Sequence, residues 1–213
     1  GGVGRRFLDG TQPSLEAQLA NLADEIAYNA HDVDDGVRSG LIDFEQVCAL
    51  PLVARFRDEA LAEHPELARM KPRRLLSETL RRMLSAQVYD VIDTTRAALA
   101  RHQPDSAEAV RQLPPLVAFS PEMRAASTAL KRFLLQQLYR HPQVMDTTAR
   151  AQRIVRELFA VYVDRPQEMP ADFAASPLPH RAVADYIAGM TDRFAIREHE
   201  RLTGQRLFDH GPG

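Results

Sequence analysis

Three polar side chains near the start of the chain stand four residues apart and carry groups that could do chemistry together. Asp24, Tyr28 and Asp32 fall on one line if the segment is an α-helix, because a helix turns by about 100° per residue. Carboxylates on a buried helix need partners, and a metal ion is one natural partner. The alternative is that the line is the solvated back face of an ordinary amphipathic helix.

The helix that must position these residues has apolar side chains at alternating spacings of four and three, which is typical of one helical face. They are Leu15, Leu19, Leu22, Ile26, Val33 and Val37. Alanines fill much of the remaining circumference, and no charged residue occurs from Ala17 to Ala23. A helix that is apolar or small on most sides is usually buried. We therefore expect the helix over 14–40 to be buried on most of its faces.

Other residues offer weaker chemistry. His31 adjoins Asp32, and such a pair can bind one metal, but two residues alone are weak support for a site. The remaining histidines form no H-x-x-x-H or H-x-x-E-H pattern, and no G-x-S-x-G motif is present. The single cysteine, Cys48, excludes a disulfide framework and a cysteine-based zinc site.

Glycine and proline set the expected fold class. No glycine occurs between Leu41 and Ala188, so the chain lacks the Gly-rich turns of a doubly wound nucleotide fold and also lacks a P-loop. Prolines separate segments with helical spacing, and strand patterns are absent. We expect an all-α, compact multi-helix bundle forming a single domain or fragment over 1–213, with a loose tail at 204–213. The expected helices cover 14–40, 43–50, 53–63, 72–99, 120–140, 142–164 and 180–202, with proline-rich connections at 103–119 and 165–179.

Composition narrows the class of protein. The 213 residues include 27 basic and 29 acidic side chains, for a net charge of −2, which argues against bulk affinity for nucleic acid. No apolar run reaches the ~18–20 residues that span a membrane. The first residues, Gly1 to Arg6, contain no apolar region of a signal peptide. We expect a cytoplasmic protein that does not enter the membrane.

Three stretches carry a family resemblance. Residues 14–36, SLEAQLANLADEIAYNAHDVDDG, closely resemble the dGTPase-like deoxynucleoside triphosphate triphosphohydrolases of the HD superfamily. Residues 184–195, ADYIAGMTDRFA, resemble the same family, as do Phe119 to Met123 together with Leu138 to Pro142. The resemblance extends over essentially the whole chain and is most specific at 14–42 and 184–195. It implies an all-α fold and a hydrolase that converts dGTP or another dNTP to deoxynucleoside and tripolyphosphate.

The resemblance also assigns roles. The family holds one divalent metal, Mg²⁺ or Mn²⁺, with a His, a His-Asp dyad and a distant Asp, and Asp24 corresponds to that distant Asp. Tyr28 corresponds to the tyrosine that faces the deoxyribose. Asp32 corresponds to the aspartate that accepts a hydrogen bond from the sugar 3′-hydroxyl. The reaction implied is metal-assisted hydrolysis at the α-phosphorus.

The chain departs from the family upstream of this helix. Only 23 residues precede Asp24, and none of them is a histidine. On this mapping His31-Asp32 cannot replace the dyad, because Asp32 already has the sugar role. We therefore expect this chain to be the C-terminal portion of a longer enzyme, with no catalytic residue beyond the metal ligand Asp24. Because one carboxylate binds a metal weakly, we expect the chain alone to retain no metal and to be inactive.

Two other readings stay open at this stage. A non-catalytic α-helical assembly or regulatory module fits the missing metal ligands. Nucleic-acid binding draws on the 25 arginines and on clusters such as Arg73-Arg74 and Arg81-Arg82, although the net charge argues against it. For the parent enzyme the resemblance implies a deoxynucleoside triphosphate as substrate and a homo-oligomer.

Overall fold

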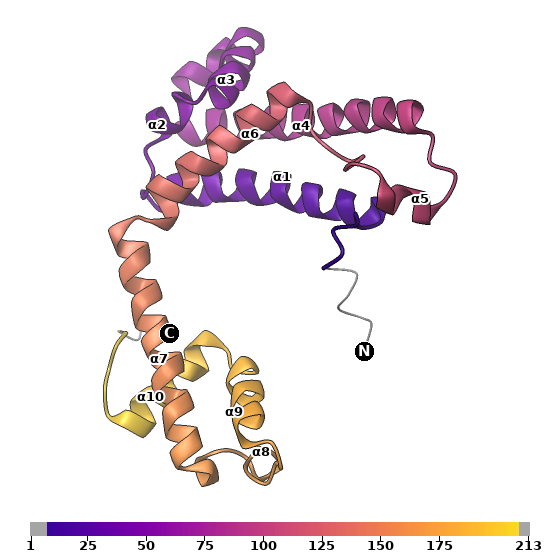
Figure 1. The fold of residues 1–213 in the computed structure, drawn as a ribbon. Coiled ribbons are helices and arrows are strands. Elements are labelled where there is room, and N and C mark those ends of the chain that lie inside the picture. Colours follow the sequence, from indigo (N-terminus) through magenta and orange to yellow (C-terminus); the bar gives the residue numbers. More distant parts are fainter. Residues whose placement is uncertain (1–7, 209–213) are drawn as a thin grey trace. The chain divides into compact units, whose positions relative to one another are not determined.

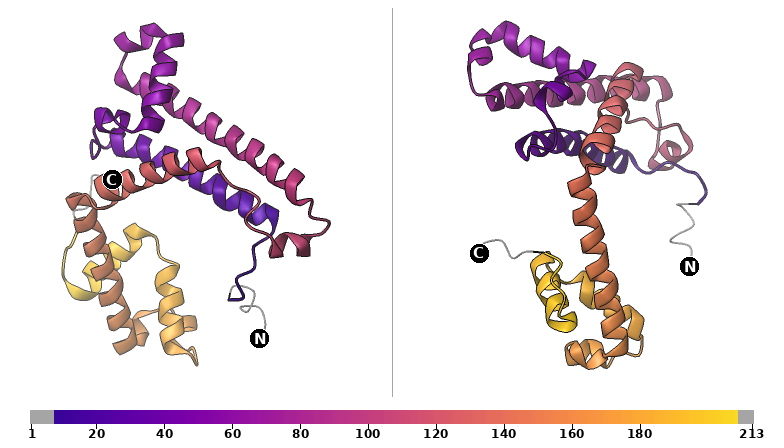
Figure 2. Two further views of the ribbon diagram at one scale, coloured as in Figure 1. Left: turned by 45° about the horizontal axis from the view of Figure 1, so that its top comes forward. Right: turned by 90° about the vertical axis from the view of Figure 1, so that its left-hand side faces the viewer.

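The computed structural model describes residues 8–208, and every regular element among them is a helix. The packing of the helices divides the chain into two compact units, the first ending at Arg140 and the second beginning at His141 (Figures 1 and 2). The all-α prediction is confirmed. The expectation of one helical domain over 1–213 stays a prediction, and residues 209–213 of the expected tail lie outside the described residues.

The first unit contains the predicted site helix and seven further helical segments. They are α1 (Leu15–Arg38), α2 (Phe44–Cys48), α3 (Pro51–Glu63), η2 (Pro65–Arg69), α4 (Pro72–His102), α5 (Ala107–Gln112), α6 (Pro121–Leu134) and the π-helical η3 (Leu135–Tyr139). The second unit contains α7 (Pro142–Asp164), η4 (Pro166–Glu168), α8 (Ala171–Ala174), α9 (Pro179–Ala188) and α10 (Asp192–Thr203).

Side-chain caps begin several helices at the expected residues. The Ser14 side chain accepts a hydrogen bond at the start of α1, and Ser120 does the same for α6. Asp43 and Gln46 form the capping box of α2. Such caps satisfy N–H groups that a helix leaves without partners at its start. Gly40, just beyond the end of α1, has a φ of 74°, a backbone conformation that glycine adopts without steric cost.

The last predicted helix is wrong in one respect. The sequence predicts one helix over 180–202, whereas the structure has two helices, α9 and α10, separated by a short turn. Gly189 is the C-cap of α9, and the Thr191 side chain caps α10 by accepting a hydrogen bond from the Phe194 N–H. A glycine followed by a threonine cap ends one helix and starts the next, so the continuous apolar spacing across this point was misleading.

The core of the first unit lies where α1, α3, α4 and α6 meet (Figure 1). Val33 of α1, Val53 of α3 and Met83 of α4 are completely inaccessible to solvent, and Leu130 of α6 is almost so. Burying an aliphatic side chain contributes about 1.5–3 kcal/mol. One face of α1 is buried in this core, and the opposite face of the helix is exposed.

Gln18 ties the connection before α6 to α1. Its side-chain oxygen accepts hydrogen bonds from the backbone N–H groups of Leu116 (2.9 Å) and Val117 (3.1 Å). Its side-chain nitrogen donates to the carbonyl oxygen of Pro13 at 2.9 Å. A buried amide with all of these partners holds two distant segments in register. Gln18 therefore fixes the connection that leads into α6 against the first turns of α1.

The second unit has a separate core between α7, α9 and α10. Leu158 and Tyr162 of α7 and Val183 of α9 are buried together. The Tyr162 hydroxyl donates to Glu198 of α10 at 2.9 Å, and the buried His199 lies 2.6 Å from Glu157. Among residues 8–208, no helix has the length and apolar character required to cross a membrane.

Candidate functional site

The three predicted site residues lie along α1 at different degrees of exposure. Asp24 is exposed, and Tyr28 is 53% exposed. Asp32, nearer the end of the helix, is partly buried. Each four-residue step advances about 6 Å along a helix. The three side chains are therefore spread along one side of α1, about 6 Å apart along the helix axis. Within the described residues, Asp24 has no hydrogen bond or ion pair.

Asp32 is the site residue with the least ordinary environment. Its Oδ2 is inaccessible to solvent and accepts no hydrogen bond within residues 8–208. Burial raises the pKa of its carboxyl, the nearby Asp35 raises that pKa further, and His31 opposes the shift. A buried acceptor without a donor is costly. The carboxyl of Asp32 therefore has one oxygen that lacks a donor among the described residues.

Tyr28 has an aromatic neighbour that the sequence did not reveal. Its ring lies against that of Tyr139, with centroids 6.4 Å apart and planes inclined by 24°. Tyr139 ends the π-helical η3, and its hydroxyl is buried with no partner among the described residues. Short π-helical turns often occur at functional sites. The two rings form an aromatic wall beside the line of carboxylates.

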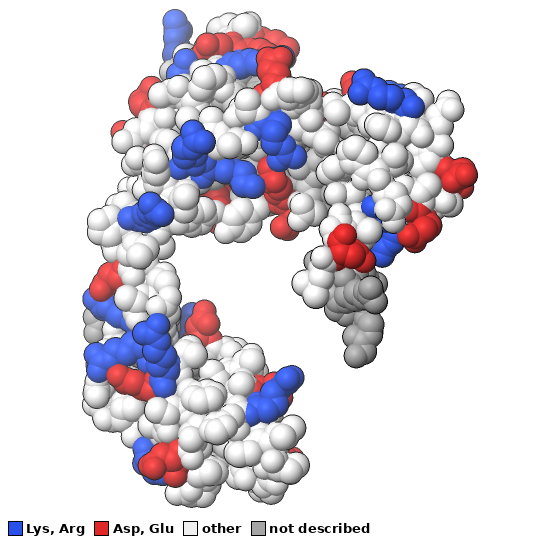
Figure 3. Space-filling model, in the orientation of Figure 1, with Lys and Arg blue, Asp and Glu red and all other residues white. Residues whose placement is uncertain are grey.

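Glu25 links the site helix to two cations of α6. Its carboxylate lies 3.1 Å from Arg124 and 3.2 Å from Lys131, and it also accepts a hydrogen bond from Ser127. Figure 3 shows basic side chains gathered over α6, with acidic ones between them. Glu25 is largely buried, whereas Lys131 remains half exposed. The ion pairs hold two cations of α6 against α1 and leave Lys131 accessible from solvent.

The expected burial of α1 on most of its faces is wrong for this chain. Ala17, Ala20 and Ala23 are exposed along with Asp24 and Tyr28. The helix packs against α4 and α6 on one side, and within residues 8–208 nothing covers the other. Asp24 and Tyr28 lie on this uncovered side of the described chain, while Asp32 is partly buried.

The residues present do not by themselves fit a divalent metal. No group of three or more His, Cys, Asp or Glu side chains in the described part of the chain is placed to hold a metal ion. Asp24 offers one carboxylate, and firm binding of a divalent cation needs several ligands. A metal centre that included Asp24 would need ligands from outside these residues.

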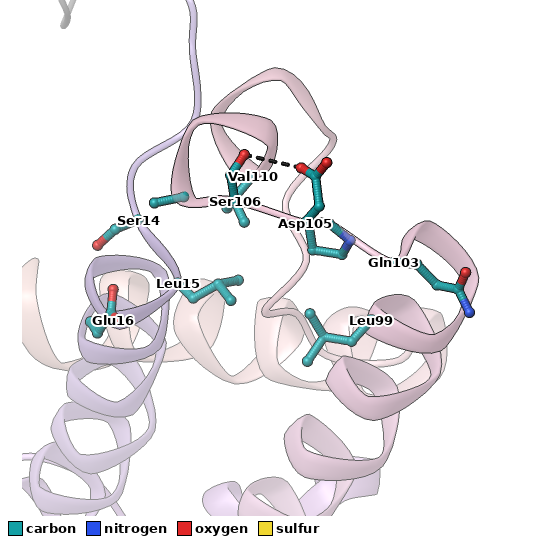
Figure 4. A pocket seen from close by; sticks show the side chains of 10 residues that line it. Ser14, Leu15, Glu16, Leu99, Gln103, Asp105, Ser106 and Val110 are labelled. Carbon is teal, nitrogen blue, oxygen red and sulfur yellow. Dashed lines mark hydrogen bonds between the residues drawn. The ribbon is translucent and has the colours of Figure 1, made fainter.

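A hollow at the start of α1 does not include the line of site residues. It has a volume of about 460 Å³ and lies between the first turn of α1, the end of α4 and α5. Figure 4 shows Leu15, Leu99 and Val110 around it, with Ser106 hydrogen-bonded to Asp105 at 3.1 Å. Its charged lining residues, Glu16 and Asp105, are acidic, which disfavours a phosphorylated ligand.

Two contributors to the site were missed or undervalued from sequence. Tyr139 lies within the resembling stretch Leu138 to Pro142 but has no assigned role there, and nothing in the local sequence assigns a role to Glu25. Both gain their role from partners about a hundred residues away in sequence, which no local spacing shows. The motif LYRHP at 138–142, which starts four residues after the last residue of α6, was the only available signal for Tyr139.

The described residues form an all-helical chain in which α1 exposes Asp24 and Tyr28, and comparison with known proteins shows what this chain is similar to. Residues 117–201 match the phosphohydrolase-associated domain family. The chain is 53% identical over 204 residues to a deoxyguanosinetriphosphate triphosphohydrolase-like protein of Bordetella pertussis, covering 95% of this chain and 52% of that protein. Proteins of the same description are 49% identical in Thiobacillus denitrificans (95% and 54% covered) and 44% identical in Nitrosomonas europaea (94% and 53% covered).

These similarities confirm the resemblance to deoxyguanosinetriphosphate triphosphohydrolase-like proteins. The chain spans about half the length of the curated relatives that it matches. Its likeness to a phosphohydrolase therefore extends over nearly all of its own residues and about half of theirs.

Proposed function

We propose that this chain is part of a deoxynucleoside triphosphate triphosphohydrolase and supplies the wall of the active site that holds the sugar. The observation that carries the proposal is the line Asp24, Tyr28 and Asp32 on the open face of α1, with the aromatic neighbour Tyr139. Tyr28 packs against the deoxyribose, where a close aromatic contact leaves no room for a 2′-hydroxyl. The partly exposed carboxylate of Asp32 accepts a hydrogen bond from the 3′-hydroxyl.

In this proposal Asp24 contributes one ligand to a metal centre whose other ligands lie outside this chain. Arg124 and Lys131 of α6 share the single carboxylate of Glu25, so this pairing leaves one net positive charge against α1, which favours a triphosphate on that side of the helix. The chain alone is inactive, because it supplies only one metal ligand and the sugar contacts of the proposed active site. Mg²⁺ or Mn²⁺, homo-oligomer formation and a cytoplasmic location remain predictions for the parent enzyme.

The surface next to the site also supports a longer parent. Leu19 of α1 is 53% exposed, and Val88 and Ile92 of α4 are 39% and 41% exposed. A hollow of about 470 Å³ runs between these helices, with Leu19 and Ile92 in its lining. Contiguous exposed apolar residues mark contact surfaces. Because the relatives are about twice as long, we propose that their remaining sequence covers this face.

A non-catalytic assembly module is the second candidate function. The same apolar face of α1 and α4 favours it, since a second copy of the chain could bind there without any chemistry. The two candidates differ in what the line on α1 does: an assembly module has no use for the unpartnered carboxylate of Asp32.

The experiment that tests the sugar role uses a chimera, defined as the Bordetella pertussis relative with its matched region replaced by this chain. We expect Asp32→Ala to raise KM for dGTP by about tenfold or more, the scale of a lost hydrogen bond to a charged group. We expect Tyr28→Ala to reduce the preference for dGTP over GTP. The control is Tyr89→Ala, an exposed tyrosine on α4. Unchanged KM and unchanged sugar preference in both site variants of an active chimera would refute the proposal.

A further inference from the structure

The strongest concentration of positive charge in the chain lies where α4 begins. Residues 69–82 contain six basic side chains and one acidic side chain, although the whole chain has a net charge of −2. The segment joins η2 to the first three turns of α4, beside the α3–α4 pair seen in Figure 2. Like charges this close repel one another, and folding of the segment does not require them.

The cations of this segment fall into two groups. Arg81 and Arg82 are neutralised, because both contact Glu78 and Arg82 also contacts Glu63 at 2.5 Å. These contacts lower the pKa of the Glu78 carboxyl to about 2, through Arg81 first and Arg82 next. The first group therefore carries little free charge.

The second group is Arg69, Lys71, Arg73 and Arg74, and all four are exposed. None of them forms an ion pair with any residue from 8 to 208. The only side-chain contact of the group there is from Arg74 to the sulfur of Met70, at 3.6 Å. Four unneutralised cations thus stand within six residues, and their charge is available to a ligand.

A hollow of about 640 Å³ lies among these residues, within the usual range for small-molecule sites. Lys71, Arg73 and Arg74 line it, together with His64 and Arg81. Its two acidic lining residues, Glu66 and Glu78, are already engaged by His64 and by the arginines. The hollow therefore presents a surplus of positive charge.

The start of α4 adds to this charge. The helix has 31 residues, and its N-cap residue, Lys71, makes no side-chain cap hydrogen bond. The N-terminus of a helix carries about half a positive charge and presents backbone N–H groups to anions. Arginine forks match the paired oxygens of a phosphate group. The helix start and the guanidinium groups of Arg73 and Arg74 therefore lie at one hollow.

From this convergence we propose that the hollow at the start of α4 binds a compact polyphosphate, such as the phosphate chain of a nucleotide, through Lys71, Arg73 and Arg74. A compact ligand suits the site better than an extended nucleic-acid strand, because the unpaired cations lie within residues 69–74 and three of them line a single hollow. The proposal does not rest on the proposed function, because it involves none of Asp24, Tyr28 and Asp32.

The test is calorimetric titration of the 213-residue chain with inorganic tripolyphosphate at 0.15 M KCl, with EDTA to exclude metal-mediated binding. We expect the double variant R73A/R74A to bind at least about tenfold more weakly, because each lost phosphate contact removes a counterion-releasing charge. The control is R96A/R101A, which removes the same charge from exposed positions later in α4 and should change the affinity less than about twofold. D24N should leave the affinity unchanged, which separates this site from the one proposed on α1.

Equal loss in the two double variants would mean that tripolyphosphate responds only to net charge, and it would overturn the proposal. So would the absence of measurable binding by the unmodified chain at this salt concentration. A second titration uses a labelled single-stranded oligothymidylate. If the oligonucleotide binds, R73A/R74A abolishes that binding and tripolyphosphate does not compete, then the segment is a nucleic-acid contact and the compact-ligand proposal is wrong.

Discussion

The carboxylate of Asp32 shows how one residue can carry both a stability cost and a binding function. Its Oδ2 is removed from water without a donor, and burial raises its pKa. Ligand-binding groups are often left unsatisfied in the free protein, since the ligand provides the missing partner. This feature lies at Asp32, the α1 residue to which the family resemblance assigns a hydroxyl ligand.

The raised pKa of Asp32 has a consequence for stability. A carboxyl whose pKa is higher in the folded state than in the unfolded state binds more protons when folded, so stability falls as the pH rises from its ordinary pKa through the raised one. We expect Asp32→Asn to increase Tm at pH 7, with the gain disappearing as the pH falls below the ordinary aspartate range. Thermal unfolding from pH 3.5 to 8 measures this. Asp93→Asn, at an exposed carboxylate on α4, is the control, and an equal gain in both variants would contradict the assignment.

Gln18 has the opposite role, because its side chain is buried and all of its hydrogen-bonding atoms have partners. Gln18→Ala would leave the N–H groups of Leu116 and Val117 without acceptors, at about 1–3 kcal/mol each. We expect the free energy of unfolding to fall by about 2–4 kcal/mol, measured by urea denaturation. Asn21→Ala, at an exposed position on the same helix, should change it by less than about 0.5 kcal/mol. A loss in Gln18→Ala no larger than this would show that the connection is not held by the amide.

Helical spacing in the sequence predicted that Asp24, Tyr28 and Asp32 share one side of α1, but it did not predict which residues of other helices contact them. Asp24, Tyr28 and Asp32 could be placed on one line because helical spacing is local. The partners of Glu25 on α6 and the contact between Tyr28 and Tyr139 depend on how α6 and η3 pack against α1. Those contacts join residues about a hundred positions apart, and no periodicity in one segment contains that information.

At the scale of elements, start and stop signals predicted the helices well where caps are strong. Ser14, the Asp43–Gln46 box and Ser120 each begin a helix as expected. The prediction of one helix over 180–202 was wrong because it relied on the apolar spacing and disregarded Gly189. Apolar residues can keep helical spacing even where one helix ends and the next begins. The short α5 and α8 lie within segments expected as connections, because four to six residues are too few for a clear periodic pattern.

The apolar face shared by α1 and α4 provides a test at the same scale. Val88→Lys should change the free energy of unfolding of this chain by less than about 0.5 kcal/mol, because Val88 is 39% exposed and a lysine there can keep its ammonium group in water. In the chimera, where the remaining sequence is proposed to cover Val88, we expect a loss of about 2 kcal/mol or more, because a lysine ammonium would be buried without a partner. Denaturant unfolding of both proteins makes the comparison.

The matched control for that experiment is Val155→Lys on α7, at a valine that is also about half exposed. It should leave both proteins within about 0.5 kcal/mol of their parents. If the chimera tolerates Val88→Lys as well as Val155→Lys, then the α1–α4 face is not covered by the remaining sequence. If this chain alone loses stability only at high protein concentration, a second copy covers the face instead.

At the scale of the whole molecule, the chain matches about half of relatives such as the Bordetella pertussis protein. It has the helix predicted to carry one metal ligand and two sugar contacts, yet no group of metal-binding side chains within residues 8–208. The exposed site helix and the neighbouring apolar face are what one part of a divided active site would show. We therefore propose that hydrolysis of a deoxynucleoside triphosphate requires both this chain and the additional sequence that its relatives have.

The most direct test is release of tripolyphosphate from dGTP with Mn²⁺ or Mg²⁺ present, measured for this chain and for the chimera. We predict no release by the chain alone, release by the chimera, and loss of at least about a hundredfold in kcat when the chimera carries Asp24→Asn, the scale expected for a group that stabilises charge in the transition state. Robust release by the 213-residue chain alone would contradict the divided site and would make His31 a candidate metal ligand. Full activity of the Asp24→Asn chimera would remove Asp24 from the site.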